Sequence, residues 1–583
     1  MMLRTFLTAL VLVAAAGCQS VPGEAGRAAQ RPNILLVVFE DMSLKVGAFG
    51  DPVATTPILD SLAQESILFP NTFTTAGVCA PSRASLITGV HQQTLGAQHM
   101  RTHAFETDFE PSGFEIGYAA VPPPEVKAFP ELLRQSGYYT FAGYGGWVIS
   151  NKKDYQFGTP FTVWDEDSEA ASWRGRAPGQ PFFGMVTLAT THESFLFPVP
   201  AIRDTELAKT VAARNERLLS GKVAVTDPSD VTVPAWLPDV SEVRREIATQ
   251  YDNIAFTEQK LAMLLEDLER DGLADDTIVI VTTDHGDGFP RAKRSVYDSG
   301  IRVPLLVRFP DGRGASEVRD ELVSFVDLAP TILSLAGAPT PEWLHGQVFL
   351  GEARDAPNSY IFAASDRMDQ WMDRSKAVRD ERYKLIRNYM PQVALLQPVA
   401  FREELRSMQA LQRLHDEGRL SDLQASYLDV PRARLELYDM EEDPEETRNL
   451  AGKPALRAVR QRLVDALDDW LERTPDLSAV FETEMVEAMW PGGRQPVTSA
   501  PSISVSRADD SGLVLASETE GASIAWRRQG NAAGAWQLYT PGTRLPADPC
   551  IEARAVRYGY GASDIVTNCV QDGDTAKTGE GEH

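Results

Sequence analysis

The chain has 583 residues and a formal net charge of −26, with 43% hydrophobic and 24% charged residues. This composition is typical of a globular protein with a large buried core, and the length allows roughly three to five domains. The acidic excess argues against a nucleic-acid partner or an anionic membrane surface, since no basic excess exists to hold phosphate groups. An anionic substrate would need a locally basic pocket.

The first residues have the pattern of an export signal. Arg4 supplies a positive charge, and residues 6–16 form an apolar run that is too short to span a membrane. Residues 15–18 (Ala-Ala-Gly-Cys) resemble the cleavage site of a bacterial lipoprotein signal. This resemblance implies that residues 1–17 are removed and that Cys18 becomes the lipidated first residue of the mature chain.

Residues 18–30 are expected to form a tether between the lipid and the fold. Gln19 stands where an Asp usually retains lipoproteins in the inner membrane, so the expected location is the bacterial outer membrane, facing the periplasm or the cell surface. The lipid anchor is the only membrane contact that we expect. Ordinary cleavage without lipidation stays open, because Ala15 is a weaker residue than Leu at its position.

Three apolar runs predict strands that are buried on both faces of a parallel sheet. The runs are Asn33–Phe39, Phe182–Leu188 and Thr277–Thr283, and a predicted amphipathic helix at residues 246–270 precedes the last of them. Polar residues follow these runs: Glu40 and Asp41, then His192, then Asp284 and His285. Ligands of open α/β sheets bind at the carboxyl ends of strands, so these side chains are candidates for a metal or catalytic site. A solvated loop is the alternative for each of them alone.

The most specific pattern lies in residues 77–89, Gly-Val-Cys-Ala-Pro-Ser-Arg-Ala-Ser-Leu-Ile-Thr-Gly. Pro81 suits the first turn of a helix, which places Cys79 at the helix N-terminus. The partial positive charge at that end favours anions and thiolates, and Arg83 lies one turn further on. A buried structural cysteine is the alternative that these residues leave open.

This segment resembles the sulfatase signature, in which a maturation enzyme oxidises the cysteine of Cys-x-Pro-Ser-Arg to formylglycine. The chain is similar to sulfatases of the alkaline phosphatase superfamily over residues 31–452. Residues 290–294 and 297–300 resemble the subgroup that includes heparan N-sulfatases and bacterial polysaccharide sulfatases. The resemblance implies an α/β fold with an alkaline phosphatase-like, doubly wound and mostly parallel sheet. It also implies a smaller C-terminal α+β subdomain.

The resemblance implies a metal site built from Glu40, Asp41, Asp284 and His285, with the oxidised Cys79 as a further ligand. The family more commonly has Asp at the position of Glu40 and Asn at that of His285. Calcium is the expected ion because most of these ligands are oxygens, and manganese is the alternative because His285 offers nitrogen. An Asp-His pair also occurs in phosphonate and phosphodiester hydrolases of the same superfamily.

The catalytic groups expected beside Cys79 surround the sulfate: Arg83, Lys152, His192 and Lys293. Lys153 is a substitute for Lys152, since the preceding segment is longer than usual in the family. The next position is commonly a histidine but is Asp154 here, which leaves one proton-transfer group open. A solvated surface residue is the alternative for each lysine alone. The residues expected on the substrate side are His99, Arg101, Asp154 and Arg291.

The catalytic domain is expected at residues 31–350 and its C-terminal subdomain at residues 351–490. Alternating runs early in the subdomain suit antiparallel strands. Later residues, 399–428 and 457–473, are predicted to be helical, and the first of these regions is expected near the cleft.

The last part of the chain predicts an appended module. A linker rich in Gly, Pro and Ser at residues 491–501 leads to short alternating runs that predict a small β-sandwich at residues 502–570. It resembles the C-terminal sandwich of chitobiases. Cys550 and Cys569 predict a disulfide in an exported chain, and two free thiols are the alternative. Residues 571–583 are expected to be a disordered tail.

Together these features predict an exported sulfatase that hydrolyses sulfate esters, or N-sulfate, of sulfated polysaccharides or oligosaccharides with a formylglycine nucleophile. Two other functions stay open. Asp284 and His285 permit a phosphonate or phosphodiester hydrolase of the same superfamily. A catalytically inactive, glycan-binding lipoprotein would show gaps among the nucleophile, metal and sulfate-binding positions, whereas nearly all of these are filled.

Overall fold

The computed structural model describes residues 31–100, 117–146, 151–505, 513–530, 536–543, 545 and 550–569. Within these residues, no helix is both long enough and apolar enough to cross a membrane. The predicted signal segment with Cys18, the tether, Arg101 and the C-terminal tail lie outside the described residues and remain predictions.

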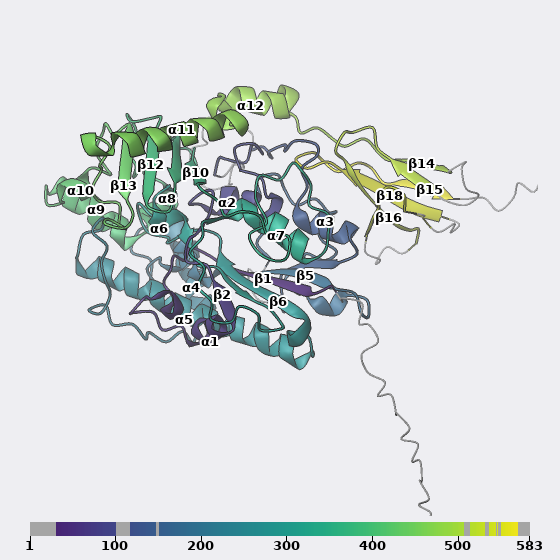
Figure 1. Ribbon diagram of the computed structural model, residues 1–583, viewed down its shortest axis with the longest axis horizontal. Helices are drawn as coiled ribbons and strands as arrows, with labels where there is room; N and C mark the ends of the chain where they lie inside the picture. The colour runs from purple at the N-terminus through teal and green to yellow at the C-terminus, as the bar shows by residue number, and fades with distance from the viewer. Residues whose placement is uncertain are drawn as a thin grey trace, which may run out of the picture. The chain divides into compact units, whose positions relative to one another are not determined.

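A six-stranded sheet lies at the centre of the fold (Figure 1). Its order is β2 (Ser66–Leu68), β8 (Leu306–Arg308), β6 (Thr277–Thr283), β1 (Asn33–Phe39), β5 (Phe182–Leu188) and β4 (Tyr139–Ala142). Strands β6, β1, β5 and β4 run parallel, and β8 is antiparallel to both of its neighbours. The three strands predicted from apolar runs are therefore confirmed, and they lie next to one another.

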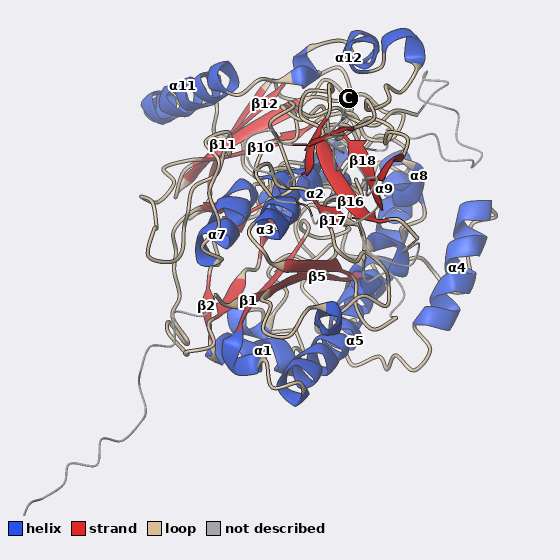
Figure 2. Ribbon diagram, turned by 90° about the vertical axis from the view of Figure 1, so that its right-hand side faces the viewer, coloured by secondary structure: helices blue, strands red, loops and turns tan. Residues whose placement is uncertain are grey.

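Side chains of β1 alternate between two hydrophobic cores, which explains why the whole run is apolar. The even-numbered residues from Ile34 to Val38 pack into one core, and the odd-numbered residues from Leu35 to Phe39 pack into the other. Helices complete both cores and form layers on either side of the sheet (Figure 2). The first layer holds α2 (Cys79–Thr88), α3 (Phe129–Gln135) and α7 (Leu328–Leu335), and the second holds α1 (Pro57–Gln64) and α5 (Ser241–Arg270). The doubly wound α/β class is confirmed, with α5 starting at Ser241 rather than at residue 246.

A four-stranded antiparallel sheet follows later in the chain. It contains β10 (Ile361–Ser365), β11 (Ser375–Arg379), β12 (Tyr383–Asn388) and β13 (Leu435–Asp439) in that order. Helix α11 (Arg457–Arg473) packs on this sheet through Leu463, Leu467 and Trp470, and its bounds match the prediction. The region predicted as helical at residues 399–428 contains three separate helices: α8 (Ala400–Glu403), α9 (Arg406–Asp416) and α10 (Asp422–Ala425).

Several shorter elements connect these sheets. A three-stranded sheet has the order β7 (Arg302–Val303), β3 (Thr72–Phe73) and β9 (Val323–Ser324). The other helices are α4 (Glu206–Leu218), α6 (Asp298–Ile301) and α12 (Glu482–Met489), with single 3-10 turns that include η3 (Ala189–Thr191) and η4 (Glu193–Phe195).

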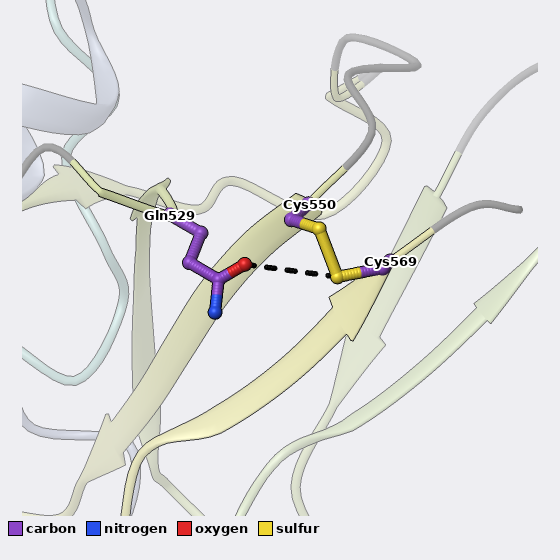
Figure 3. The surroundings of a disulfide bond; sticks show 3 residues. All are labelled: Gln529, Cys550 and Cys569. Atoms are coloured by element: carbon purple, nitrogen blue, oxygen red, sulfur yellow. Dashed lines mark hydrogen bonds between the residues drawn. A yellow bond between two sulfur atoms is a disulfide. The ribbon is translucent and has the colours of Figure 1, made fainter.

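The last strands form two small antiparallel sheets around a core of their own. One sheet pairs β14 (Ser502–Val505) with β15 (Leu513–Ala516), and the other has the order β17 (Gln537–Leu538), β16 (Ser523–Arg528), β18 (Cys550–Val556) and β19 (Val566–Cys569). Cys550 and Cys569 lie directly opposite each other on β18 and β19 and form a disulfide (Figure 3). This arrangement is a small β-sandwich, and the exact domain boundaries remain predictions.

Candidate active site

Cys79 is the first residue of α2 and is buried at the edge of the central sheet. Its backbone neighbour Val78 is extended, and no side chain caps the helix N-terminus. The N–H groups of the first turn therefore add positive potential around the cysteine sulfur. Gly77 must be glycine, because a Cβ atom there would lie 2.2 Å from Ser295 O. Gly89 ends the helix in the left-handed conformation, with φ of 70°.

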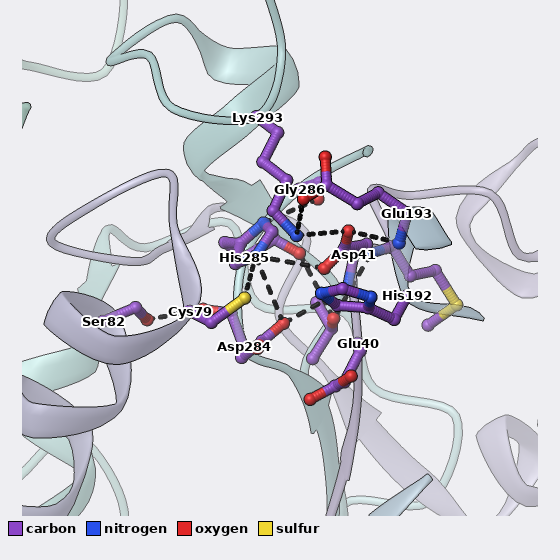
Figure 4. A network of polar contacts seen from close by, with 12 residues as sticks. Glu40, Asp41, Cys79, Ser82, His192, Glu193, Asp284, His285, Gly286 and Lys293 are labelled. Carbon is purple, nitrogen blue, oxygen red and sulfur yellow. Dashed lines mark hydrogen bonds and ion pairs between the residues drawn. The ribbon is translucent and has the colours of Figure 1, made fainter. Parts of the chain in front are cut away.

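Four buried side chains around Cys79 form a group of possible metal ligands. The ligand atoms of Asp41, Cys79, Asp284 and His285 all lie within 4.8 Å of one another (Figure 4). The strands bring them together, because Phe39 pairs with Thr283 in the parallel register of β1 and β6. The residues that follow both strands must therefore meet at the same edge.

A carboxylate oxygen and an imidazole nitrogen in this group face each other. Nδ1 of His285 lies 2.9 Å from Gly286 O and donates to it, so Nε2 is the nitrogen that can bind either a proton or a metal. Nε2 lies 3.1 Å from Asp41 Oδ1 and 3.3 Å from Cys79 Sγ. Among the described residues, Asp41 Oδ1 has no hydrogen-bond partner other than this nitrogen, which pairs with it only when protonated. Such a pair needs a proton or a cation between the two atoms.

The pKa of His285 also indicates that this position attracts a cation. Burial alone would lower the pKa of His285, but the carboxylates of Asp284 and Asp41 raise it to about 10. The same negative field that retains a proton there attracts a divalent cation. Two carboxylates and an imidazole are a suitable donor set for such an ion, so these residues fit the expected metal.

Glu40 lies beside this group but faces two cations. Its Oε1 accepts from Arg83 Nη2 at 3.1 Å and lies 2.7 Å from Lys152 Nζ. Arg83 also donates from Nε to Asp284 Oδ2 at 3.0 Å, so its guanidinium bridges the ends of β1 and β6. Burial opposes the charge of Arg83, but Asp284 and Glu40 raise its pKa above the ordinary value. The ligand role of Glu40 stays a prediction.

Lys293 reaches the cluster from the opposite side. Its Nζ lies 2.6 Å from Asp41 Oδ2 and 3.3 Å from Glu193 Oε1. Burial alone would lower the pKa of Lys293, but Asp41 and Cys79 raise it. Glu193 also forms a two-pronged ion pair with Arg294 at 2.6 and 2.8 Å, and its N–H donates to Asp41. Glu193 and Arg294 were not predicted, although each directly follows a predicted residue.

His192 is held as a neutral ring. Its Nδ1 accepts from the backbone N–H of Ser194 at 3.2 Å and lies 2.8 Å from the Ser194 hydroxyl. Arg214 on α4 donates to that hydroxyl at 2.7 Å while its guanidinium covers the ring of Phe195. Burial, then Lys293 and Lys152, lower the pKa of His192 well below its ordinary value. The proton of the neutral ring is therefore on Nε2.

The predicted catalytic residues are thus brought together, while the described members of the predicted substrate set make other contacts. His99 is buried: its Nδ1 accepts from Arg367 N at 3.3 Å, and burial lowers its pKa to about 4. Asp154 is half-buried two residues after Lys152. Arg291 is enclosed by the rings of Trp236, Tyr297 and Tyr427 and donates to Glu446 O at 2.8 Å. Its contacts are those of a packing residue.

The chain matches two family models. The model described as Sulfatase covers residues 32–338, and that described as N-sulphoglucosamine sulphohydrolase, C-terminal, covers residues 288–408. An ulvan-active sulfatase from Formosa agariphila is 37% identical over 92% of this chain and 91% of its own length. The human N-sulphoglucosamine sulphohydrolase is 29% identical over 76% of this chain and 90% of its own length.

Solved structures share the fold. One is a complex with the substrate D-glucosamine-2-N,6-O-disulfate, with a TM-score of 0.51 and 18% identity over 77% of this chain and 100% of that chain. Another, described as a 2-O GAG sulfatase, gives a TM-score of 0.52 with 18% identity over 77% of this chain and 94% of that one. At this identity the likeness concerns the arrangement of the strands and helices.

Proposed function

The chain belongs to the sulfatase family and is a sulfuric ester hydrolase, and on that premise we propose that it removes sulfate from sulfated polysaccharides or their oligosaccharides through an oxidised Cys79. The observation that carries the proposal is the place of Cys79. It stands at a helix N-terminus, 3.3 Å from His285, within a group of possible metal ligands. Three cations surround it: Arg83 and Lys152 pair with the neighbouring Glu40, and Lys293 pairs with Asp41.

The relatives suggest which glycans to test first. The Formosa agariphila relative is named as ulvan-active, and it matches this chain over nearly its whole length. The human relative is named for N-sulphoglucosamine, which carries sulfate on nitrogen. Both names describe sulfated sugars, so we propose a sulfated polysaccharide of the ulvan type as the first substrate and glucosamine N-sulfate as the second.

Two groups that the polypeptide does not itself contain complete the site. Asp41, Asp284 and His285, together with the oxidised Cys79, would hold a divalent cation, with calcium first and manganese as the alternative because of the His285 nitrogen. When bound, that ion supplies positive charge that stabilises anions and activates an oxygen nucleophile. Oxidation of Cys79 to formylglycine by a maturation enzyme supplies the nucleophile itself.

The remaining side chains stabilise charge. A sulfate ester is an anion, and its hydrolysis places more negative charge on oxygen, so fixed cations lower the barrier. Burial alone would lower the pKa values of Lys152 and Lys293, but Cys79 and then Glu40 raise that of Lys152, and Asp41 and then Cys79 raise that of Lys293. His192 holds its proton on Nε2 and is placed to donate it toward the leaving oxygen. Lys293 is the alternative proton donor.

Export is the second part of the proposal. The disulfide between Cys550 and Cys569 forms in oxidising compartments, which supports the predicted signal segment. Lipid attachment at Cys18 would anchor the enzyme to the outer membrane. Labelling with a radioactive fatty acid should mark the wild-type chain and not a Cys18→Ser variant.

The decisive experiment measures sulfate release. The enzyme is produced together with a formylglycine-generating enzyme and incubated with ulvan oligosaccharides, N-sulfated glucosamine and an aryl phosphodiester. We expect sulfate release from at least one glycan and none from a Cys79→Ala variant. Faster turnover of the phosphodiester would favour the phosphodiesterase alternative. Glycan binding without any Cys79-dependent release would identify an inactive binding protein.

A further inference from the structure

The appended β-sandwich touches the segment that carries Lys152. The ring of Tyr558, from the sandwich, stacks on Phe157 with centroids 5.3 Å apart and planes inclined by 11°. Phe157 in turn stacks on Tyr155 at 5.7 Å and 25°. All three rings are at most 2% exposed. Tyr155 is three residues beyond Lys152, so a continuous stack of rings links the sandwich to the candidate sulfate-binding lysine.

A buried carboxylate joins the two parts of the protein. Glu131 on α3 is fully buried and accepts hydrogen bonds from Thr162 Oγ1 at 2.6 Å, from Tyr558 OH at 2.9 Å and from Ser523 Oγ. Two of these three donors belong to the sandwich. The hydroxyl of Tyr558 also accepts from Ala128 N at 3.1 Å. Without the sandwich, Glu131 would lose two of these three donors, so its hydrogen bonding depends on the sandwich.

The backbones also approach closely at this joint. A Cβ atom on Gly559 would lie 2.2 Å from Ala120 O, and one on Gly521 would lie 2.3 Å from Pro124 O. Both glycines have positive φ, 80° and 70°. Two turns of the sandwich therefore fit against the catalytic part without room for a side chain. A module on a free tether would not need such a fit.

The contact continues into the segment of Lys152. Ala120, which meets Gly559, donates from its N–H to Gln156 O at 2.8 Å. Gln156 lies between Tyr155 and Phe157, and its side chain donates to His99 O. The segment is thus fixed from both sides before it reaches Lys152, whose Nζ lies 2.7 Å from Glu40 Oε1. The loop would otherwise have to order itself around a sulfate, at an entropic cost.

We propose that the β-sandwich is a positioning module of the active site, in which Tyr558 and Glu131 hold residues 155–157 and so keep Lys152 beside Glu40. Tyr558 is then a positioning residue and does not touch the substrate. The inference rests on the proposed role of Lys152 in binding sulfate. It differs from a role as a freely tethered carbohydrate-binding domain, whose removal would leave turnover of a small substrate unchanged.

The first test measures amide hydrogen exchange and does not require catalysis. In Tyr558→Ala, residues 151–157 should exchange at least about 10-fold faster than in the wild type, whereas amides of α5 stay equally protected and report an intact fold. The matched control is Tyr560→Ala, two residues away, whose ring lies over Arg557 at 5.0 Å within the sandwich. Unchanged exchange at residues 151–157 in Tyr558→Ala, or the same increase in Tyr560→Ala, would overturn the proposal.

The second test is a double-mutant cycle on kcat/KM with a small sulfated substrate. Tyr558→Ala should lower kcat/KM about 10-fold in the wild type and less than about twofold in a Lys152→Ala background. Equal losses in both backgrounds would mean general destabilisation and would overturn the proposal. Tyr558→Phe keeps the stack and should retain most activity. Normal activity of Lys152→Ala alone would remove Lys152 from the proposed function, while the exchange result would still decide whether the sandwich holds the segment.

Discussion

Two of the buried charge clusters in the described part of the chain differ in the kind of group that faces their carboxylates. In the first, Asp298 on α6 meets Arg379 of β11 and Lys384 of β12. Lys384 Nζ also lies 2.8 Å from Glu446 Oε1, and the other Glu446 oxygen accepts from Asp298 N at 2.7 Å. Each carboxylate oxygen thus faces a cation or an N–H group.

In the second cluster, at the ends of β1 and β6, one carboxylate oxygen faces an imidazole. Asp41 Oδ1 lies 3.1 Å from His285 Nε2, beside Cys79, and either a proton on the ring or a metal cation can satisfy this contact. The comparison shows that buried charge by itself does not identify a reactive site. The distinguishing feature is a carboxylate that faces an imidazole, because a metal cation can take the place of the imidazole proton, whereas Lys and Arg side chains satisfy their carboxylates without any added ion.

The comparison also reassigns a sequence motif. Residues 297–300, Tyr-Asp-Ser-Gly, contribute to the resemblance with polysaccharide sulfatases. In the structure, Asp298 ties the catalytic part to the antiparallel sheet through Arg379 and Lys384. Gly300 has no room for a side chain, since a Cβ atom would lie 2.1 Å from Ala292 O. The contacts of this motif therefore join the two sheets, and they do not indicate which glycan is bound.

The largest expected effect comes from removing a possible metal ligand in the second cluster, which contains Asp41, Asp284 and His285. Asp284→Asn should reduce the rate of sulfate release by roughly 10³-fold or more, because both cation binding and the orientation of Arg83 are lost. Steady-state kinetics and calorimetric titration with Ca²⁺ or Mn²⁺ would measure the two effects. Activity within tenfold of the wild type would exclude Asp284 as a ligand.

A substitution in the first cluster, around Asp298 and Lys384, should reduce the stability of the protein rather than its activity. Lys384→Met leaves Asp298 and Glu446 with an uncompensated charge, so the free energy of unfolding should fall by about 3–5 kcal/mol. The value of kcat/KM well below the melting temperature should change less than about twofold. The control is Arg382→Met, whose exposed side chain pairs with Asp439 and should contribute little to the free energy of unfolding. If Lys384→Met lowered kcat/KM as much as Asp284→Asn does, the proposed difference between the two clusters would be wrong.

Substitutions of His192 test whether its neutral ring donates a hydrogen bond at the second cluster. His192→Ala should lower kcat/KM by roughly 10²-fold, the effect of removing one positioned hydrogen-bond donor. His192→Gln retains an N–H group at a similar distance and should recover part of that loss. Equal activity of the two variants would show that the Nε2 proton plays no part.

The smallest effect concerns His99, which we place in the fold rather than in the substrate site. Its folded-state pKa of about 4 is below the unfolded value of 6.5, so between these pH values the unfolded chain binds a proton that the folded chain does not. Stability must therefore fall as the pH falls through this window, by about 2 kcal/mol between pH 7 and pH 5. Urea unfolding of His99→Asn should lack this component, and an unchanged pH dependence would contradict the assignment.

The sequence predicts the central sheet well, because β1, β5 and β6 are buried on both faces and must be continuously apolar. It predicts residues 399–428 as one helical region, whereas the structure has three separate helices there. Leu405, which lies between two of them, packs in one core with Ile247 and Tyr251 of α5. Local pattern cannot show such breaks, which depend on tertiary contacts.

The site is predictable where a motif fixes the spacing. Cys79 and Arg83 share one helix, and Asp41 and Asp284 follow paired strands, so their meeting is a consequence of the fold. The sequence alone cannot show which basic residue of this segment reaches the site. Lys293 contacts Asp41, whereas Arg291, two residues earlier, lies among aromatic rings. It also gives no sign of Glu193, because its role depends on the distant residues that it contacts.

The most direct test of the central claim is the chemical state of residue 79. Active protein is produced together with a formylglycine-generating enzyme, digested with trypsin, and the peptide ending at Arg83 is analysed by mass spectrometry. The account predicts that residue 79 carries the aldehyde of formylglycine and that activity rises with its occupancy. A preparation with full sulfate-releasing activity and an unmodified Cys79 thiol would contradict it.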